Sequence, residues 1–413
     1  MSRVISRQAN RFTNPRRAAL AGVAVALLLV PACSTDSASE PEGDTATVSF
    51  PDNKATGSPV KIGLINPEGG PAVSLPGNRE AAVAATEYAN AHLGGIDGHP
   101  IELVQCSNKE DPASARDCAN QMVEAGVSAV VVTTTGQGES MAPIITGSGI
   151  SYIAPNGSSN AELSSPNAFM LTSGFPGMLM SMASYAGSQG YDKVTAFVSD
   201  NNSAVPATQG IGGPAFQAAG VELQIVPVAQ GTPDATPQVS AGLSGKPDAV
   251  AVIGDATLCT SLIKALSTLG SDADTMLIQP CMDPSTVQAV GSMMDGAHVF
   301  TTSDITSSDP EAVLYRSVMQ QFAPDTDIEG FTVTGYQGIL GLVRATAGLQ
   351  GEPTAGAVSA AIAAAKDVVL PAGHGITFAC DGSALPALPA VCSTGLVSAT
   401  VVDGKTTDPQ LAK

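Results

Sequence analysis

From Val60 onward, short apolar runs alternate with longer amphipathic stretches, and this alternation restricts the possible folds more than any other feature of the chain. Residues 60–65, 101–105 and 129–133 are predicted to form buried strands. Helix signals lie between them, such as Asp111-Pro112, which supplies an N-cap and a proline for the first helical turn. Strands that alternate with helices predict a parallel α/β fold.

The same pattern occurs twice. A second series of strands is predicted at residues 193–199, 221–226, 249–253, 276–279 and 298–302. Two helices follow at 311–322 and 331–349, and the tail contains short strands and turns. We therefore predict two doubly wound parallel-sheet lobes, the first from 59–172 plus 302–350 and the second from 173–301 plus 351–413. Because open α/β sheets bind ligands beyond the carboxyl ends of their strands, a ligand cleft is expected between the lobes.

Residues 1–32 have the organisation of a secretory signal peptide. Five arginines, with no acidic residue, precede an uncharged run of 15 residues, which is shorter than the roughly 20 that a membrane-spanning helix needs. Val30, Ala32 and Cys33 resemble the lipobox of bacterial lipoproteins, in which the cysteine becomes the acylated first residue. This resemblance implies lipidation of Cys33 and an extracytoplasmic protein anchored to the outer face of the cell membrane. An ordinary secreted protein with an unmodified Cys33 is the alternative.

The segment that follows Cys33 has few large apolar side chains. Residues 33–58 are rich in small, polar and acidic residues, and we predict that they form a disordered stalk behind the lipid. Without the five arginines of the signal, the chain has 13 basic and 37 acidic side chains, a formal charge of 13 − 37 = −24. Nucleic acid and anionic lipid headgroups bind basic surfaces, so both are excluded as expected partners.

Six further cysteines form three pairs that are close in sequence: Cys106 with Cys118, Cys259 with Cys281, and Cys380 with Cys392. Six cysteines allow 15 connectivities, and local pairing is our prediction among them. In an exported protein, disulfides are favoured over metal binding. The four histidines are scattered along the sequence, so no metal site is predicted.

Polar residues follow several of the predicted strands. In the first half they are mostly neutral, whereas aspartates recur in the second half. The candidate ligand-binding residues are Thr135, Gly136, Gln137, Ser158, Ser159, Ser203, Asp255 and Asp283. Hydroxyls and N–H groups at helix N-termini could receive a carboxylate, and an aspartate could face an ammonium group. The alternative for each of these side chains is a helix cap.

Signatures of common enzyme classes are absent. The chain has no dinucleotide-binding glycine motif, no Walker sequence and no nucleophile elbow. We therefore predict no enzymatic activity and no cofactor. A catalytic group assembled from residues distant in sequence stays open as an alternative.

Three motifs point to a family. Lys61-Ile62-Gly63-Leu64, Gly94-Gly95-Ile96-Asp97-Gly98 and Ser158-Ser159-Asn160 resemble the type I periplasmic binding proteins, especially the leucine/isoleucine/valine-binding proteins of ABC importers. The resemblance spans nearly all of residues 60–413. It implies a monomeric two-lobed clamp that closes on one small molecule and docks on a membrane permease.

The resemblance also assigns roles to the candidate residues. It implies that Thr135, Gly136, Gln137, Ser158 and Ser159 hold a ligand carboxylate. Amino-acid receptors of the family often have two tyrosines in the second lobe, and this chain has roughly Ser203 at one of these positions and Asp255 or Ala256 at the other. The glutamate that holds the ammonium group in those receptors corresponds to the region from Cys281 to Asp283, with Asp283 as the candidate.

The predicted function is that of a lipid-anchored solute-binding protein of an ABC importer. Its ligand is expected to be a small polar solute, an amino acid or a related amide or carboxylate. Two alternatives stay open: a ligand sensor of the same fold that signals to a membrane receptor, and a surface enzyme, such as an amidase, that uses the same cleft.

Overall fold

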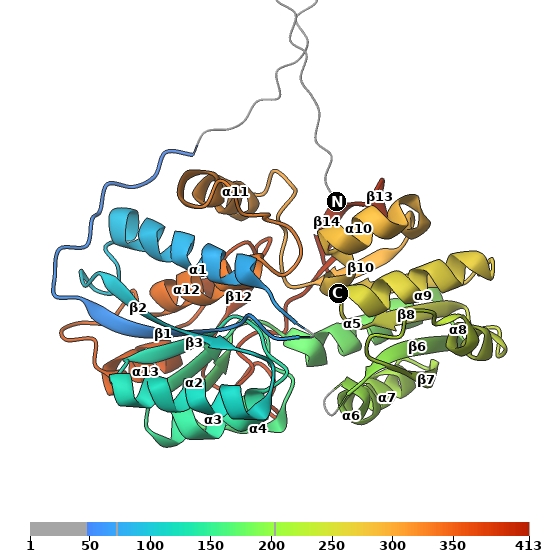
Figure 1. Ribbon diagram of the computed structural model, residues 1–413, viewed down its shortest axis with the longest axis horizontal. Helices are drawn as coiled ribbons and strands as arrows, with labels where there is room; N and C mark the ends of the chain where they lie inside the picture. Colours follow the sequence, from blue (N-terminus) through green and yellow to red (C-terminus); the bar gives the residue numbers. More distant parts are fainter. Residues whose placement is uncertain (1–47, 72, 202–203, 413) are drawn as a thin grey trace, which may run out of the picture. The chain divides into compact units, whose positions relative to one another are not determined.

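A computed structural model describes residues 48–71, 73–201 and 204–412. The predicted signal peptide, Cys33 and Ser203 lie outside these residues. The described chain forms two principal sheets with helices on both faces, and the predicted fold class is confirmed (Figure 1).

The first sheet has the order β2-β1-β3-β4-β5 and is parallel throughout. Its strands are β1 (Val60–Pro67), β2 (Ile101–Asn108), β3 (Ala129–Val132), β4 (Ser151–Ala154) and β5 (Ala168–Met170). One face carries α1 (Pro76–Tyr88), which continues as a π-helical turn (Ala89–Leu93), and α12 (Val333–Ala345); the other carries α2 (Pro112–Ala125) and α3 (Gly138–Gly147) (Figure 1). We refer to this sheet and the helices packed on it as the first lobe.

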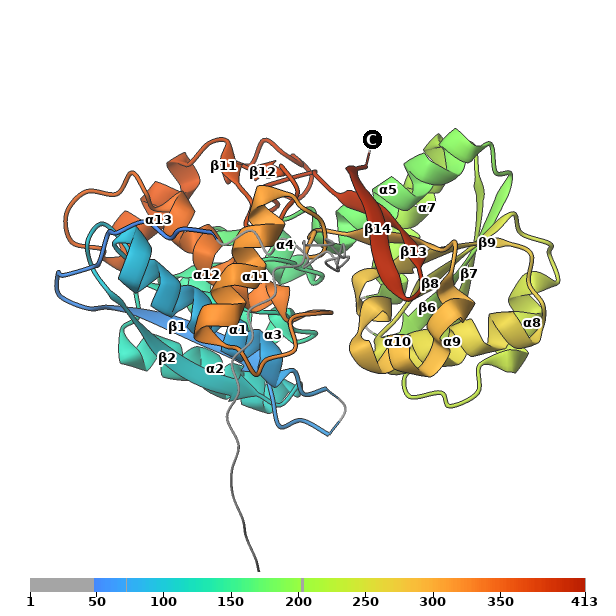
Figure 2. The ribbon, with the colours of Figure 1, turned by 90° about the horizontal axis from the view of Figure 1, so that it is seen from above.

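The second sheet has the order β14-β13-β10-β9-β8-β6-β7. Its parallel strands are β6 (Lys193–Asp200), β7 (Glu222–Ala229), β8 (Ala249–Ile253), β9 (Asp274–Ile278) and β10 (His298–Thr301). The edge strands β13 (Val397–Val402) and β14 (Lys405–Leu411) are antiparallel. Figure 2 shows α5 (Gly174–Gln189) and α7 (Gly213–Ala218) on one face, and α8 (Thr236–Leu243), α9 (Ala256–Thr268) and α10 (Pro284–Val290) on the other. This sheet and its helices are the second lobe.

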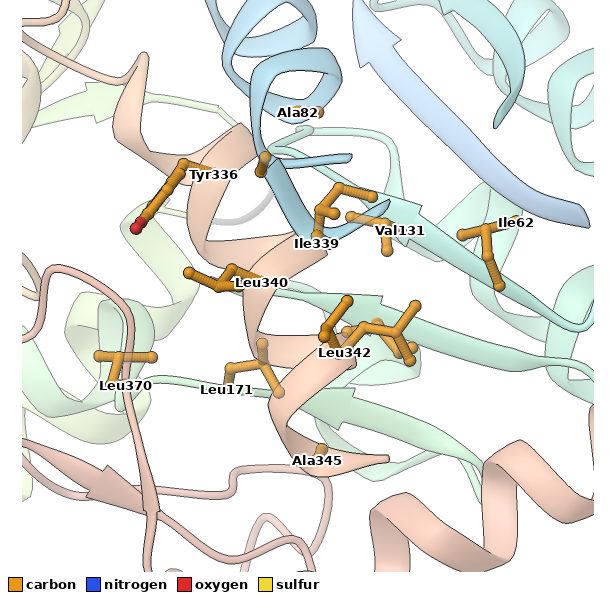
Figure 3. Close-up of a cluster of buried hydrophobic side chains, with 14 of the residues drawn as sticks. Ile62, Ala82, Val131, Leu171, Tyr336, Ile339, Leu340, Leu342, Ala345 and Leu370 are labelled. Carbon is orange, nitrogen blue, oxygen red and sulfur yellow. The ribbon is translucent and has the colours of Figure 1, made fainter. Parts of the chain in front are cut away.

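Helix α12 forms the centre of the first core, and every one of its residues except Arg344 is buried. Its side chains meet Ala82 of α1 and Val131 of β3 (Figure 3). Three glycines spaced by three residues, Gly335, Gly338 and Gly341, allow this close approach. A Cβ atom at Gly335 would lie 1.8 Å from the carbonyl oxygen of Asn78 in α1.

The chain returns to the second lobe later than residue 351, where the sequence analysis placed the change. Helix α11 (Pro310–Phe322) and α12 belong to the first lobe, and so do α13 (Ala355–Ala364), β11 (Val368–Val369) and β12 (Thr377–Phe378). The reason is apolar packing, because Val358 and Ile362 lie one turn apart on α13 and belong to the same buried cluster as Ile62 and Leu370. Figure 3 shows Ile62 and Leu370 in this cluster. Only β13 and β14 return to the second sheet.

Within the described residues, the chain therefore passes between the sheets at about residues 171–174, 302–309 and 393–396. The first and third connections contact each other, because the Ser173 hydroxyl donates to the carbonyl oxygen of Gly395 at 3.1 Å. Such short connections between two lobes are typical of hinges.

The local cysteine pairing is confirmed. Disulfides join Cys106 to Cys118, Cys259 to Cys281, and Cys380 to Cys392. The first connects β2 with α2, and the second connects α9 with the 3-10 turn Gln279–Met282. None of the helices in the described residues is both long and apolar enough to cross a bilayer.

The end of the predicted stalk is ordered, which corrects its expected boundary at residue 58. The ring of Phe50 lies 4.8 Å from that of Tyr88 and 5.1 Å from that of His92, between ring centroids. Ala55 is buried and donates its N–H to the carbonyl oxygen of Asn90 at 2.8 Å. The prediction used the average composition of 33–58, in which Phe50 and Ala55 have little weight. These two residues attach the segment to the first lobe.

We expect Phe50→Ala to lower the free energy of unfolding by about 2 kcal/mol, because a partly buried ring loses its aromatic contacts. Urea unfolding followed by circular dichroism measures the change. Asp52→Ala, at an exposed position of the same segment, is the control and should change stability by less than about 0.5 kcal/mol. Equal stabilities of the two variants would show that the segment does not pack on the lobe.

Candidate ligand-binding site

A cavity of about 430 Å³ is lined by loops from both lobes, and this volume is typical of small-molecule sites. From the first lobe come the loops that follow β1, β2, β3 and β4. From the second come those that follow β6, β7, β8 and β9. These are the carboxyl ends of parallel strands, where α/β sheets place their ligands.

The structure brings together most of the candidate residues. Thr135, Gly136, Ser158, Asp255 and Asp283 line the cavity. Gln137 and Ser159 are not part of the lining, although each is adjacent in sequence to a residue that is. Ser203 lies outside the described residues, but its neighbours Asn201 and Ala204 line the cavity.

Glu110, which was not among the predicted site residues, accepts hydrogen bonds from the donors of the loop after β3. Its Oε1 accepts from the Thr135 hydroxyl at 2.7 Å and from Asn108 Nδ2 at 2.8 Å, and its Oε2 accepts from the N–H of Gly136 at 2.9 Å. The Gln137 amide donates to the carbonyl oxygen of Glu110. The position of Glu110, two residues after β2 and just before Asp111-Pro112, is the sequence signal that could have identified it.

Glu162 uses the donors of the loop after β4 in a similar way. Its Oε2 accepts from the N–H groups of Ser158 and Ser159 at 3.1 and 3.0 Å and from the Ser159 hydroxyl at 2.8 Å. Tyr152 donates its hydroxyl to Oε1 at 2.8 Å. Burial raises the pKa of Glu162, and these donors oppose the rise. The hydroxyl of Ser159 also accepts from the N–H of Glu162, so the two residues form a capping box for the short helix α4 (Asn160–Ser164).

The hydrogen bonds of the first-lobe loops therefore differ from those that the resemblance implies, in which the loops hold a ligand carboxylate. The Thr135 hydroxyl and the Gly136 N–H already bind the carboxylate of Glu110, and the N–H groups of Ser158 and Ser159 already bind that of Glu162. The physical reason is the position of Glu110 and Glu162, which lie close enough to bond the backbone N–H groups of these loops.

The aspartates of the second lobe line the cavity and also cap helices. Asp255 Oδ1 accepts from the N–H of Leu258 at 2.9 Å, at the start of α9. Asp283 Oδ1 accepts from the N–H of Ser285 at 2.9 Å, at the start of α10. The cap alternative holds for both residues, and both still contribute negative charge to the lining.

Much of the remaining lining is apolar. Phe175 and Met178 come from the first turns of α5, and Phe331 precedes α12 by two residues. Ile253 and Ile278 end β8 and β9. Apolar walls with a few polar groups are typical of sites that bury a small organic molecule. These apolar side chains were not predicted from the sequence, because only polar residues of the strand-end loops carry a local signal for ligand binding.

We expect Ser159→Ala to lower the free energy of unfolding by about 1 kcal/mol through loss of the capping box, with no direct effect on the cavity. Thermal unfolding and ligand titration of the same variant measure both effects. Ser164→Ala, on the exposed side of the same helix, is the matched control. Weaker ligand binding at unchanged stability would instead place Ser159 in the ligand site.

Comparison with known proteins agrees with this geometry. A family model described as "Periplasmic binding protein" matches residues 59–391. The structure is similar to a leucine-binding protein, LivK, from Thermotoga maritima MSB8, with a TM-score of 0.72 at 17% identity over 86% of this chain and 98% of that one. No functionally curated protein sequence matches the chain.

Two further solved structures have bound ligands. LivJ, a branched-chain amino acid transporter substrate-binding protein from Streptococcus pneumoniae str. Canada MDR_19A in complex with isoleucine, has a TM-score of 0.69 at 19% identity and covers 86% of this chain and 99% of that one. A solute-binding protein of an ABC transporter from Rhodopseudomonas palustris BisB5, in complex with 3,4-dihydroxybenzoic acid, has a TM-score of 0.69 at 20% identity, with coverage of 86% and 97%.

The match over 59–391 and the two-lobed α/β architecture agree with the motifs recognised in the sequence. The chain belongs to the periplasmic binding protein family.

Proposed function

We propose that this protein is the solute receptor of an ABC importer, which binds one small molecule in the cavity between its lobes and delivers it to a membrane permease. The observation that carries the proposal is the cavity of about 430 Å³, which strand-end loops of both lobes line. A ligand that contacts both lobes stabilises their closed arrangement, because only that arrangement provides all the contacts. The short connections between the sheets would act as the hinge.

We also propose that the receptor is monomeric and is anchored outside the cytoplasm through an acylated Cys33. More than one acyl chain holds a soluble domain stably at a bilayer, since each buried CH₂ group contributes about 0.8 kcal/mol. The aromatic contacts of Phe50 would fix the end of the stalk on the first lobe. Fractionation of cells that express Cys33→Ser tests the anchor: the variant should leave the membrane fraction, and retention there would contradict lipidation at this residue.

A thermal-shift screen tests the receptor function. The chain has no tryptophan, so an environment-sensitive dye is required. The panel contains amino acids, amides, organic cations, aromatic acids and short peptides. A ligand at about 100 times its Kd should add about 2.7 kcal/mol to stability and raise the melting temperature clearly.

The recovered compound separates the receptor from an enzyme. Mass spectrometry of the ligand after incubation should return it unchanged, whereas conversion to a product would favour the amidase alternative. A panel that leaves the melting temperature unchanged throughout would count against a solute receptor.

A further inference from the structure

We propose that the cavity selects an organic cation that carries no carboxylate. The inference rests on the proposed function and narrows it, because the resemblance alone implies a ligand carboxylate held by the first lobe. Three features of the cavity support it: the sign of its charged residues, the use of its donors, and its aromatic walls.

The charged side chains that line the cavity in the described residues are all acidic. Glu110 comes from the first lobe, and Asp255 and Asp283 from the second. No lysine, arginine or histidine is present among the described lining residues. In a partly desolvated site, opposite charges attract and like charges repel more strongly than in water. The lining therefore attracts a cation from both lobes and disfavours an anion.

The two aspartates keep an acceptor for such a ligand. Their helix caps use Oδ1 of each carboxylate. In the described part of the chain, no hydrogen bond involves Oδ2 of Asp255 or Asp283. An ammonium or amidinium group could thus bond Oδ2 without disturbing either cap, which makes a charge-assisted hydrogen bond available.

The hydrogen-bond donors of the first lobe independently support a ligand without a carboxylate. A ligand carboxylate that bonds the Thr135 hydroxyl and the Gly136 N–H would have to displace Glu110. One that bonds the N–H groups of Ser158 and Ser159 would have to displace Glu162. Displaced Glu162 would stay in a buried position without these donors. A buried charge without its hydrogen-bond donors is unfavourable. These donors therefore already form hydrogen bonds with the protein's own carboxylates.

Phe175 and Phe331 provide aromatic surface in the same lining. A ring face attracts a cation, and an apolar wall accommodates the hydrocarbon part of the ligand. The expected ligand combines a positive group with an apolar body and has no acidic group.

Probes of similar size and different charge test the charge preference. The purified protein is titrated calorimetrically with benzamidine, benzamide and benzoate, and with leucinamide, leucine and 4-methylpentanoate. The cations should bind at least tenfold more tightly than the carboxylates of the same series, and added salt should weaken the cations only. Equal or tighter binding of benzoate or leucine would overturn the inference and leave the receptor function intact.

A wider set of organic cations, including choline, agmatine and spermidine, completes the panel. If none of the cations binds while an anion or neutral compound does, the inference is wrong and the receptor function stands. If no compound in this panel or in the thermal-shift screen binds, both proposals fail.

Variants that remove one negative charge test which cavity residues produce the preference for cations. Asp255→Asn keeps an oxygen for the α9 cap, and Glu110→Gln keeps an acceptor for Thr135 or Gly136. Each should weaken the tightest cation by about tenfold without weakening benzoate. Glu124→Gln removes one charge from the exposed side of α2, outside the cavity, and should change neither Kd. Unchanged cation affinity in both cavity variants would overturn the proposal.

Discussion

Replacing Gly335 with alanine is expected to lower the free energy of unfolding by about 3 kcal/mol, at the upper end of the range for an overpacked core. The added Cβ would lie 1.8 Å from the carbonyl oxygen of Asn78 and 2.9 Å from the backbone nitrogen of Ala82. Both atoms are backbone atoms of α1, so no side-chain rotation relieves the contact. Helices α1 and α12 would have to separate, which opens gaps in the core that they share with β3.

A glycine with open space around the position of a Cβ provides the control. Gly356 lies in the exposed first turn of α13, and a Cβ there would meet no atom within 4 Å. Alanine at this position should raise stability by about 0.5 kcal/mol, because alanine loses less conformational entropy in a helix than glycine. Urea unfolding followed by circular dichroism compares the two variants. If Gly335→Ala were as stable as the parent protein, the close packing of α1 against α12 would be wrong.

Removal of the Cys259–Cys281 disulfide is the second large effect. We expect the double variant Cys259→Ala/Cys281→Ala to lose about 3 kcal/mol, because the bond restricts the unfolded chain over a sequence separation of 22 residues. Alanine is preferred to serine, since both cysteines are fully buried and a hydroxyl would need a partner there.

This disulfide also connects two parts of the cavity lining. Cys281 lies between Pro280 and Asp283, and Cys259 follows Asp255 by one helical turn. Its loss should therefore weaken ligand binding as well as stability. The control is Cys106→Ala/Cys118→Ala, which removes a bond of separation 12 outside the lining. The control should lose similar stability and keep the parent Kd. Equal Kd values in both double variants would show that the Cys259–Cys281 bond does not position the site.

Local sequence patterns predicted most strands and many helices. The run at Ala249–Ile253 has the predicted bounds, because five consecutive apolar residues are typical of a parallel strand that is covered on both faces of its sheet. Asp111-Pro112 caps α2 as expected, and Asp111 accepts from the N–H groups of Ala113 and Ser114. Such signals act within a few residues and need no knowledge of the rest of the chain.

Helix α13 shows where local patterns were insufficient. Its alanine-rich sequence has little contrast between an apolar and a polar face, so the periodicity that identifies a helix is weak. The Thr354 cap, which accepts from the N–H of Ala357, was the available signal. The packing of α13 on the first lobe depends on Val358 and Ile362 meeting residues hundreds of positions earlier, such as Ile62.

The sequence by itself determined the two α/β lobes and the strand-end loops that face one cavity, because periodicity and strand direction are encoded locally. The cysteine spacing favoured local disulfides without fixing them, since six cysteines allow 15 connectivities. Only the tertiary structure decided what those loops can still bind. Glu110 reaches Thr135 across 25 positions of sequence, and Phe175 of α5 lines the same cavity as Phe331, which lies in the turn before α12. A sequence shows which hydrogen-bond donors exist, but folding decides whether an acceptor of the protein itself already bonds them.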